Sequence, residues 1–392
     1  MDLLSVWYLG IIAISGHVLH IITGLETGGA ERSLFNLATA SRGTGLVHSV
    51  LSLADAGCYG PMLQQQGISV ETLSMRGGAG LPGALVRVRA LIRRMRPDIV
   101  QGWMPHGNVI ATLAAAMSGR RVGLAWNVRQ SLYDLRSEKI ATQWMIRGLK
   151  SFSARPEAII YNSHQAREHH EALGFSPRHG LVIPNGFDTE RWKPDTRRRA
   201  ELRARLGLND AVPLAGFVGR FHALKDVPTF MAASAIAMKE NPQMHVIMVG
   251  DGLTRNNGVL APLFANLPLQ RFHALGQRDD IEMILPAMDF FCLSSASEAF
   301  PNVVGEAMAS GLPCIASDVG DCAKLIGDHG RIVPRGDATR MAAAMVEMAR
   351  MDVARRSEIG EAARKKITNS YGLSVTVDAY SQLYDSMMKR EA

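Results

Sequence analysis

Short apolar runs alternate with segments of helical length along nearly the whole chain, and this alternation limits the fold more than any other feature of the sequence. In the first half, apolar runs lie at 18–23, 48–53, 98–102, 122–127, 158–163 and 180–185, separated by helix-length segments such as 31–40, 82–95, 108–117 and 137–152. This pattern predicts parallel strands that are connected by helices, as in a doubly wound sheet.

The alternation begins again after an arginine-rich polar stretch at 191–210, with apolar runs at 213–219, 245–250, 272–276, 289–294, 313–317 and 330–334. A chain of 392 residues has room for two domains of ~100–200 residues each. We therefore expect an α/β protein with two Rossmann-like domains that face a central cleft. The expected boundaries are 1–195 for the N-terminal domain, 196–370 for the C-terminal domain and 371–392 for a C-terminal helix that packs back toward the first domain.

The composition excludes several other classes of protein. Hydrophobic residues make up 47% and charged residues 20% of the chain, so it is neither disordered nor collagen-like. The four cysteines contain no C-x-x-C pair, which argues against a zinc ribbon and a dense disulfide framework and favours the cytoplasm. The apolar run at 3–14 is shorter than the ~20 residues of a spanning helix. It is interpreted as a short extension, a start codon placed too early or an element that skims a membrane.

Loops that follow strands should carry the site, because parallel sheets bind ligands at the carboxyl ends of their strands. Gly28 and Gly29 lie between a predicted strand and a predicted helix, where glycines allow a ligand to approach the backbone, although a tight turn also requires them. His106 follows another predicted strand and precedes a helix expected from Asn108; as a neutral or protonated imidazole it could assist a reacting centre. The next strand-end loop carries polar side chains that would line the same side, namely Asn127, Arg129 and Gln130.

Two segments of the second half carry more specific chemistry. The sequence V-G-R-F-H-A-L-K-D at 218–226 places Arg220 and Lys225 in one strand-end loop, and two fixed cations suit a diphosphate. The segment at 294–313 holds Glu298 in a loop and Glu306 inside the following helix. A carboxylate in that helix could accept hydrogen bonds from both hydroxyls of a ribose, while the helix N-terminus near 301–302 faces phosphates. An exposed pair of glutamates remains the structural alternative.

The glycine loop at 28–29 does not read G-x-G-x-x-G, which argues against the dinucleotide interpretation. The sequence also contains no G-x-x-x-x-G-K-[ST], no D-x-D and no H-E-x-x-H. We therefore expect neither a dinucleotide cofactor nor a metal, so that the charge of a leaving diphosphate would be neutralised by Arg220, Lys225 and the helix terminus.

Taken together, the motifs resemble those of retaining glycosyltransferases of family 4, which have the two-domain GT-B fold. The resemblance runs from about residue 17 to the C-terminus. It rests on G-G-A-E at 28–31, His106, I-P-N-G-F-D at 183–188, V-G-R-x₄-K at 218–225, V-G-D-G at 249–252, L-G-x-R at 275–278 and the pair Glu298 and Glu306.

The resemblance implies a role for each matching residue. It gives catalytic roles to His106, Glu298, Arg220 and Lys225, with Glu298 as the contact to the transferred sugar and Glu306 as the ribose ligand. The donor would be bound by Gly28, Gly29, Gly219, Arg220, Lys225, Gly250, Gly276, Arg278, Phe300, Pro301, Asn302, Val303 and Glu306. Two segments depart from many relatives: A-F-P-N replaces a glycine-rich loop, and W-N-V-R-Q replaces a histidine-containing one.

The implied activity is transfer of a sugar from a nucleotide diphosphate sugar, with UDP favoured, to a glycan acceptor with retention at the anomeric carbon. F-P-N-V-V-G-E and W-N-V-R resemble bacterial enzymes that act on lipid-linked glycans or surface polysaccharides, so a polyprenyl-diphosphate-linked acceptor is expected. Three alternatives remain open: a transferase or synthase with a soluble acceptor, an epimerase of the same fold, and a two-lobed sugar-binding protein.

The net charge of +7 is concentrated in the first half, where residues 1–195 hold 20 basic and 14 acidic side chains. At 82–96, apolar residues share one side of a predicted helix and arginines cover the other: Arg87, Arg89, Arg93, Arg94 and Arg96. Such a helix could rest on an anionic membrane from the cytoplasmic side. An ordinary surface helix that packs on the sheet through its apolar side is the alternative. No nucleic-acid partner is expected.

Overall fold

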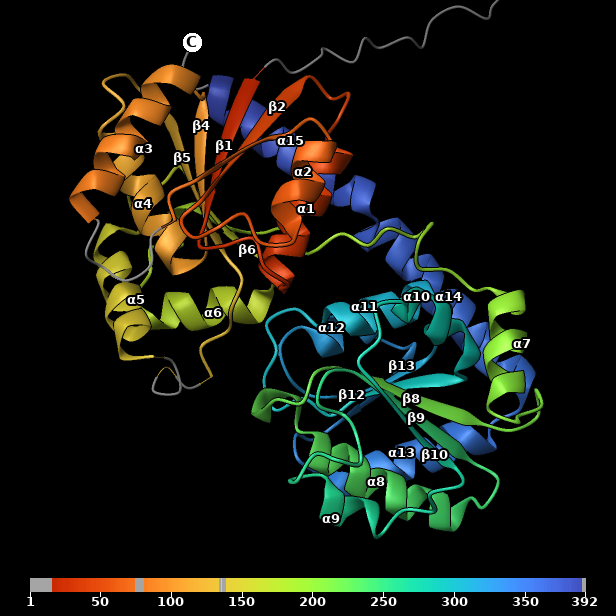
Figure 1. Ribbon diagram of the computed structural model, residues 1–392. Coiled ribbons are helices and arrows are strands. Elements are labelled where there is room, and N and C mark those ends of the chain that lie inside the picture. The colour runs from red at the N-terminus through yellow and green to blue at the C-terminus, as the bar shows by residue number, and fades with distance from the viewer. Residues whose placement is uncertain (1–15, 75–80, 134, 136–138, 390–392) are drawn as a thin grey trace, which may run out of the picture. The chain divides into compact units, whose positions relative to one another are not determined.

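The computed structural model describes residues 16–74, 81–133, 135 and 139–389, and the apolar run at 3–14 lies outside them. The described residues contain two parallel sheets, so the predicted α/β fold with two such sheets is confirmed (Figure 1). By spatial contact the chain divides into unit 1, formed by 1–127, 144–159 and 377–392, and unit 2, formed by 128–143 and 160–376.

The first sheet has seven strands in the order β3-β2-β1-β4-β5-β6-β7. Its strands are β1 (Gly16–Ile22), β2 (Leu46–Ser52), β3 (Ser69–Thr72), β4 (Ile99–Trp103), β5 (Gly123–Val128), β6 (Ala158–Tyr161) and β7 (Gly180–Val182). The strand order reverses between β1 and β4, which are neighbours and pair in parallel. The carboxyl ends of these two strands therefore form a topological switch point, which is where such sheets bind ligands. The short strand β3 has no counterpart among the predicted runs.

Helices cover both faces of the first sheet. They are α1 (Gly29–Ala40), α2 (Tyr59–Gln65), α3 (Leu81–Met95), α4 (Met104–Ala116), α5 (Ile140–Phe152) and α6 (His164–Leu173). Figure 1 shows α3, α4 and α5 on one face and α1 and α2 on the other. This division follows from right-handed crossovers, because the chain moves along the sheet in opposite directions before and after β3.

The C-terminal helix α15 (Leu373–Lys389) contributes its residues from 377 onward to unit 1. The hydroxyl of Tyr384 donates a hydrogen bond of 2.7 Å to Gln101 Oε1 on β4, and Asn127 Nδ2 on β5 donates one of 2.6 Å to the hydroxyl of Tyr380. Buried polar groups need such partners, so α15 is tied to the sheet by hydrogen bonds as well as by apolar packing.

The second sheet has six strands in the order β10-β9-β8-β11-β12-β13. They are β8 (Leu214–Val218), β9 (His245–Val249), β10 (Phe272–Gly276), β11 (Phe290–Leu293), β12 (Cys314–Ser317) and β13 (Gly330–Val333). Alternate residues of β9 enter two separate cores: Val246 and Met248 lie in one, Ile247 and Val249 in the other. A sheet that is buried on both faces explains why its strands are continuous apolar runs.

The helices of the second half are α7 (Thr196–Arg205), α8 (Val227–Glu240), α9 (Ala261–Phe264), α10 (Ile281–Ile284), α11 (Asn302–Ala309), α12 (Cys322–Ile326), α13 (Ala338–Arg350) and α14 (Val353–Tyr371). The polar stretch at 191–210 was expected only as a connection, but it contains α7. Two ion pairs fix α7 to the rest of the fold, since Arg199 and Arg203 both pair with the buried carboxylate of Asp289.

Candidate active site

His106 is positioned by the direct passage of the chain from β4 into α4, with no loop between them. Trp103 ends β4 and Met104 begins α4 with a φ of 64°, a left-handed value that is strained for a residue with a side chain. A Cβ at Gly102 would lie 2.5 Å from the backbone of Asn108, so only glycine permits this close turn. The prediction that the helix begins at Asn108 is therefore wrong, and His106 lies in the first turn of α4.

Partial burial lowers the pKa of His106 below its ordinary value. A lowered pKa makes the imidazole neutral at pH 7, and a neutral imidazole can accept a proton or a hydrogen bond. Gly28 and Gly29 lie elsewhere in unit 1, at the start of α1.

Three long helices lack a side-chain N-cap, and each of them carries predicted site residues in its first turn or at its cap. They are α1 at Gly28 and Gly29, α4 at His106 and α11 at Asn302. The other five helices of at least eight residues with a described N-cap have a capping side chain: Ser163, Asp195, Asp226, Asp337 and Asp352. Backbone N–H groups at an uncapped terminus can bind an anionic ligand.

The residues predicted for the acceptor side separate into two groups. Asn127 is fully buried as the fifth residue of β5, so its predicted place in a loop is wrong, and its amide holds Tyr380 of α15. Arg129 donates to Asn185 Oδ1, and Asn185 Nδ2 donates a hydrogen bond of 2.6 Å to Asn302 Oδ1. Gln130 has a buried Nε2 atom without a hydrogen-bond partner among the described residues.

Backbone hydrogen bonds join the loops that follow β8, β9 and β10. The amide of Gly219 donates to the carbonyl of Val249 over 3.0 Å, and the amide of Gly250 donates to that of Gly276 over 2.8 Å. A Cβ at Gly250 would lie 1.8 Å from the carbonyl oxygen of Gly219, and the φ of Gly250 is 150°, so glycine is required there. Three predicted donor-binding glycines, Gly219, Gly250 and Gly276, are thus brought together at the carboxyl ends of β8, β9 and β10.

Two predicted cations extend from these loops. Arg220 is exposed and pairs with none of the described residues. Arg278 is exposed as well and forms two hydrogen bonds with Asp280, of 2.9 Å and 2.7 Å. Hydrogen bonds from Arg278 lower the pKa of Asp280. Arg220 therefore remains available to an anionic ligand, whereas Arg278 is held by its neighbour.

Lys225 and Glu298 form a half-buried ion pair. Lys225 Nζ lies 2.5 Å from Glu298 Oε1, and Ser295 Oγ donates a hydrogen bond of 2.7 Å to the same oxygen. The hydroxyl of Ser294 fixes the lysine loop by donating to the backbone carbonyls of Lys225 and Asp226, over 3.0 Å and 2.9 Å. The loops after β8 and β11 are thereby joined, and the predicted phosphate cation touches the predicted sugar carboxylate.

Sequence reasoning did not single out Ser295, which is fully buried. The available signal is its place three residues before Glu298 in the loop after β11, where a hydroxyl can reach back to a carboxylate.

Close packing on an aromatic ring positions α11. A Cβ at Gly305 would lie 2.0 Å from the ring of Phe187, so this glycine lets the helix lie directly on the I-P-N-G-F-D segment. Phe300 also stacks on Phe187, with ring centroids 6.0 Å apart. Glu306, the next residue of α11, is buried. The predicted residues Phe300, Pro301, Asn302 and Val303 form the loop end and first turn before it.

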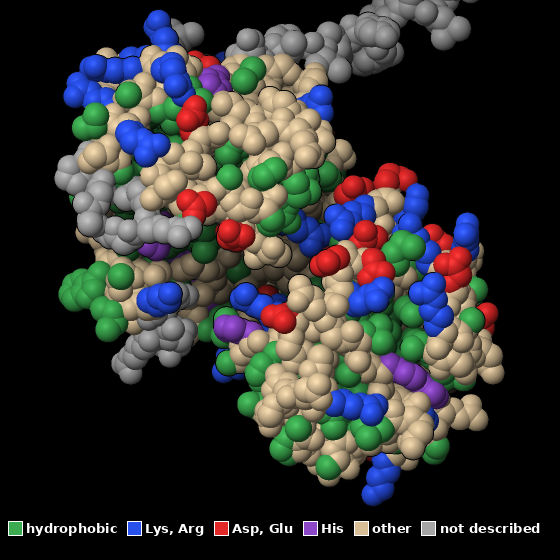
Figure 2. All heavy atoms as spheres, in the orientation of Figure 1, with side chains coloured by type: hydrophobic (Ala, Val, Ile, Leu, Met, Phe, Trp, Pro, Cys, Tyr) green, Lys and Arg blue, Asp and Glu red, His purple; other side chains and the backbone are tan. Residues whose placement is uncertain are grey.

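The arginine-rich helix α3 packs on the first sheet as an ordinary surface helix. Its residues Val88, Leu91 and Ile92 are buried, so the interpretation that the apolar side covers the sheet is correct. Figure 2 shows basic side chains gathered over α3.

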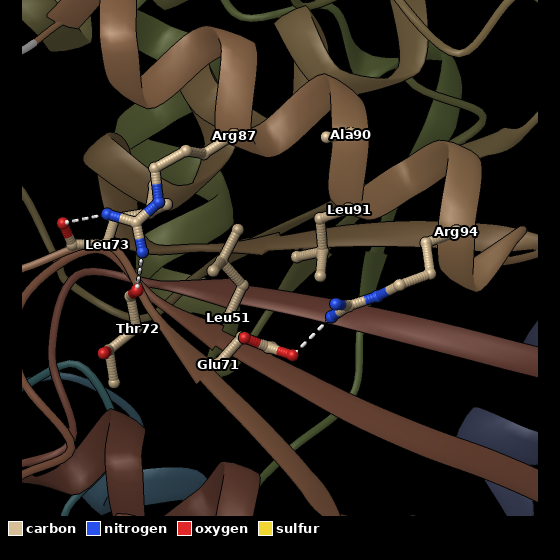
Figure 3. Close-up of a pocket in the computed structure, with 8 residues that line it drawn as sticks. All are labelled: Leu51, Glu71, Thr72, Leu73, Arg87, Ala90, Leu91 and Arg94. Atoms are coloured by element: carbon tan, nitrogen blue, oxygen red, sulfur yellow. Dashed lines mark hydrogen bonds and ion pairs between the residues drawn. The ribbon is translucent and has the colours of Figure 1, made fainter.

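A cavity of about 220 Å³ lies between α3 and β3 (Figure 3). At its rim, Arg87 donates to the carbonyl oxygens of Thr72 and Leu73, over 2.8 Å and 3.1 Å, and Arg94 pairs with Glu71. Two of the five arginines therefore fasten α3 to β3. The other three, Arg89, Arg93 and Arg96, are exposed.

Two further features concern the described part of the chain. It contains no group of three or more His, Cys, Asp and Glu side chains arranged to hold a metal ion. None of its helices combines the length and the apolar character needed to cross a bilayer.

Two family models match most of the chain. Residues 27–191 match the model described as Glycosyltransferase Family 4, and residues 212–351 match the model described as Glycosyl transferases group 1. The first match begins just before Gly28 and the second ends at the end of α13, so the two matches cover the predicted site loops of both halves.

Individual relatives point in the same direction. The UDP-Gal:alpha-D-GlcNAc-diphosphoundecaprenol alpha-1,3-galactosyltransferase of Escherichia coli is 26% identical over 319 residues, which are 78% of this chain and 79% of that protein. A lipopolysaccharide core biosynthesis glycosyltransferase of Rhizobium meliloti is 27% identical over 305 residues, or 77% of this chain and 79% of that protein. The structure of HepE from Anabaena in complex with UDP-glucose has the same fold, with a TM-score of 0.80, 22% identity and coverage of 95% of this chain and 100% of that one.

Proposed function

The chain belongs to the glycosyltransferases of group 1 and family 4 with the GT-B fold, and we propose that it transfers a sugar from a UDP-sugar to a hydroxyl of a glycan acceptor with retention. The observation that carries this proposal is the contact between Lys225, Glu298 and Ser295 at the edge of the second sheet. It places a cation suited to a phosphate beside a carboxylate suited to sugar hydroxyls.

The donor site is proposed to use the joined loops of the second sheet. Arg220 and Lys225 hold the diphosphate together with the N-terminus of α11, which no side chain caps. Glu306 accepts hydrogen bonds from the ribose hydroxyls and Glu298 from the transferred sugar. The preference for UDP is supported by the name of the E. coli relative and by the UDP-glucose complex of HepE.

In the proposed reaction, the bond between the anomeric carbon and the diphosphate oxygen breaks while the acceptor oxygen forms a bond on the same face. The acceptor proton passes to the leaving phosphate, so no second carboxylate is needed as a nucleophile. Arg220 and Lys225 stabilise the charge that develops on the diphosphate, and the neutral imidazole of His106 acts at the reacting centre. We propose that no metal takes part.

We propose that the acceptor is a lipid-linked glycan used for a bacterial surface polysaccharide and that the enzyme works in the cytoplasm at the membrane surface. The name of the E. coli relative, which includes a diphosphoundecaprenol acceptor, supports this choice. The cationic surface formed by Arg89 and Arg93 of α3 and by Arg96 just after it, all three exposed, suits the headgroups of such a membrane.

A radiolabelled transfer assay tests the proposal. The purified protein is incubated with UDP-sugars and GDP-sugars, each with a diphosphate-lipid glycan and with its water-soluble analogue, and the product anomer is determined by NMR. Arg220→Ala and Glu306→Ala should each lower kcat/KM at least about tenfold, which corresponds to ~1.4 kcal/mol. Unchanged kcat/KM in both variants refutes the site, and an inverted anomer refutes retention. Transfer to the water-soluble analogue without any transfer to the diphosphate-lipid glycan refutes the lipid-linked acceptor.

A further inference from the structure

One face of α5 exposes large apolar side chains to solvent. Ile140 is 73% exposed, Trp144 is 70% exposed and Phe152 is 44% exposed. Their spacing of four and eight residues places them on one side of the helix. The opposite side, with Ile146 and Leu149, is buried. Scattered exposed apolar residues are common, but an aligned set with two aromatic rings on one helix indicates a surface that binds something.

Basic side chains surround these rings. The guanidinium of Arg147 lies 5.9 Å from the ring centroid of Trp144, and that of Arg155 lies 4.9 Å from the ring of Phe152. Lys150 is exposed between them, and α5 contains no acidic residue. Aromatic rings flanked by lysine and arginine are typical of protein segments that lie at the boundary between lipid headgroups and acyl chains.

The segment of the sequence that contains α5 is also cationic. Residues 73–156 hold 14 of the 43 basic side chains of the protein and only 3 of its 36 acidic ones. This segment therefore has a net charge of +11, which exceeds the +7 of the whole chain. It includes α3, α4 and α5, which cover the same face of the first sheet in Figure 1. An anionic surface is the partner that such a charge distribution attracts most strongly.

We propose that the exposed face of α5, with Trp144 and Phe152 as anchors, docks this layer of helices onto an anionic lipid bilayer. The arginine-rich helix α3 adds charge through its exposed arginines but no aromatic anchor, because it contains no aromatic residue and its apolar side chains Val88, Leu91 and Ile92 are buried, with Val86 exposed. Anchoring thus depends on a helix without an unusual arginine content. The inference rests on the proposed lipid-linked acceptor and names the surface by which the enzyme reaches it.

Vesicle sedimentation of the full-length protein tests the inference. Vesicles of pure phosphatidylcholine are compared with vesicles that contain phosphatidylglycerol, for the wild type, for Trp144→Ala with Phe152→Ala, and for Arg147→Gln with Lys150→Gln and Arg155→Gln. Removal of three cations at ~1 kcal/mol each should weaken binding about hundredfold. The aromatic double variant should lose at least about tenfold in affinity. Val353→Ala, which changes an exposed valine of α14, is the control.

Transfer to a water-soluble acceptor separates this inference from the proposed function. The aromatic double variant should keep this transfer activity although it no longer binds vesicles. Equal unfolding midpoints show that the variants remain folded. The inference is overturned if the wild-type protein does not bind anionic vesicles, or if the aromatic variant binds them as tightly as the wild type does. It is also overturned if the aromatic variant changes the oligomeric state in light scattering, because the face would then bind a second copy of the chain.

Discussion

The ion pair between Lys225 and Glu298 leads to opposite predictions for two substitutions that both disrupt it. In the absence of the donor, the carboxylate of Glu298 neutralises Lys225, the cation that is proposed to bind the diphosphate. Glu298 Oε1 lies 2.5 Å from Lys225 Nζ. The side chains of Lys225 and Glu298 are only 24% and 13% exposed, so screening by water is limited. Donor binding must therefore compete with Glu298 for the ammonium group.

Lys225→Met removes the proposed diphosphate contact and should weaken the binding of UDP. A hydrogen bond to a charged group contributes about 1.5–3 kcal/mol, which corresponds to a roughly 10- to 150-fold increase in Kd. Glu298→Gln should leave the Kd of UDP unchanged or lower it up to about tenfold, because the lysine loses its competitor. Its kcat should nevertheless fall, because the contact to the transferred sugar is lost.

Isothermal titration calorimetry with UDP measures both effects, and Lys239→Met on the surface of α8 serves as a matched control. The double variant Lys225→Met with Glu298→Gln completes a cycle that isolates the coupling between the two side chains. Wild-type affinity in Lys225→Met would show that this lysine does not bind the diphosphate. A large loss of affinity in Glu298→Gln would show that the pair positions the lysine instead of competing for it.

Four other perturbations test the rest of the site, the metal prediction and the core of unit 1. Ser295→Ala should lower kcat about tenfold at unchanged Kd for UDP, because one hydrogen bond to the sugar carboxylate is lost, and Ser295→Thr should restore kcat. Gly305→Ala should lower the free energy of unfolding by about 1–3 kcal/mol, because its Cβ would overlap the ring of Phe187; an unchanged urea midpoint contradicts this. Excess EDTA should leave transfer unchanged, and activity that returns only with added Mg²⁺ or Mn²⁺ would reject the metal-independent mechanism. Burial and repulsion from His48 lower the pKa of His20, and burial lowers the pKa of His48 to about 4, so unfolding takes up protons below pH 6.5. Stability in urea titrations should therefore fall from pH 7 to pH 4. The shift of His48 alone corresponds to about 3 kcal/mol, and His48→Gln should reduce the slope.

Local signals in the sequence were sufficient for most strands and helices. The two sheets appeared as apolar runs because most of their parallel strands are buried on both faces. The exceptions have local reasons. The strand β3 has only four residues, none of them buried, so it lacks an apolar run. The helix α4 begins at Met104 because the chain turns directly from β4 into the helix, at a strained φ that no sequence motif announces.

The motifs themselves named the candidate residues of the site, but they did not show which of them touch. Arg220 and Lys225 are five residues apart in one loop, yet the structure leaves the first exposed and pairs the second with Glu298, which is 73 positions away. Asn127 ends the apolar run at 122–127, and the sequence pattern places it in the loop that follows, whereas the structure buries its side chain in β5 and pairs its amide with Tyr380.

The sequence by itself determined the α/β architecture and the family and named the candidate residues of the proposed donor loops, because apolar period, glycine placement and motif spacing are local properties of the chain. Only the tertiary structure decided which charges neutralise each other and which helix faces remain exposed. Arginines drew attention to α3, but packing buries its apolar side and leaves the aromatic face of α5 open. The same amphipathic pattern can face a sheet or the solvent, and which of the two it faces depends on the neighbours that the fold supplies.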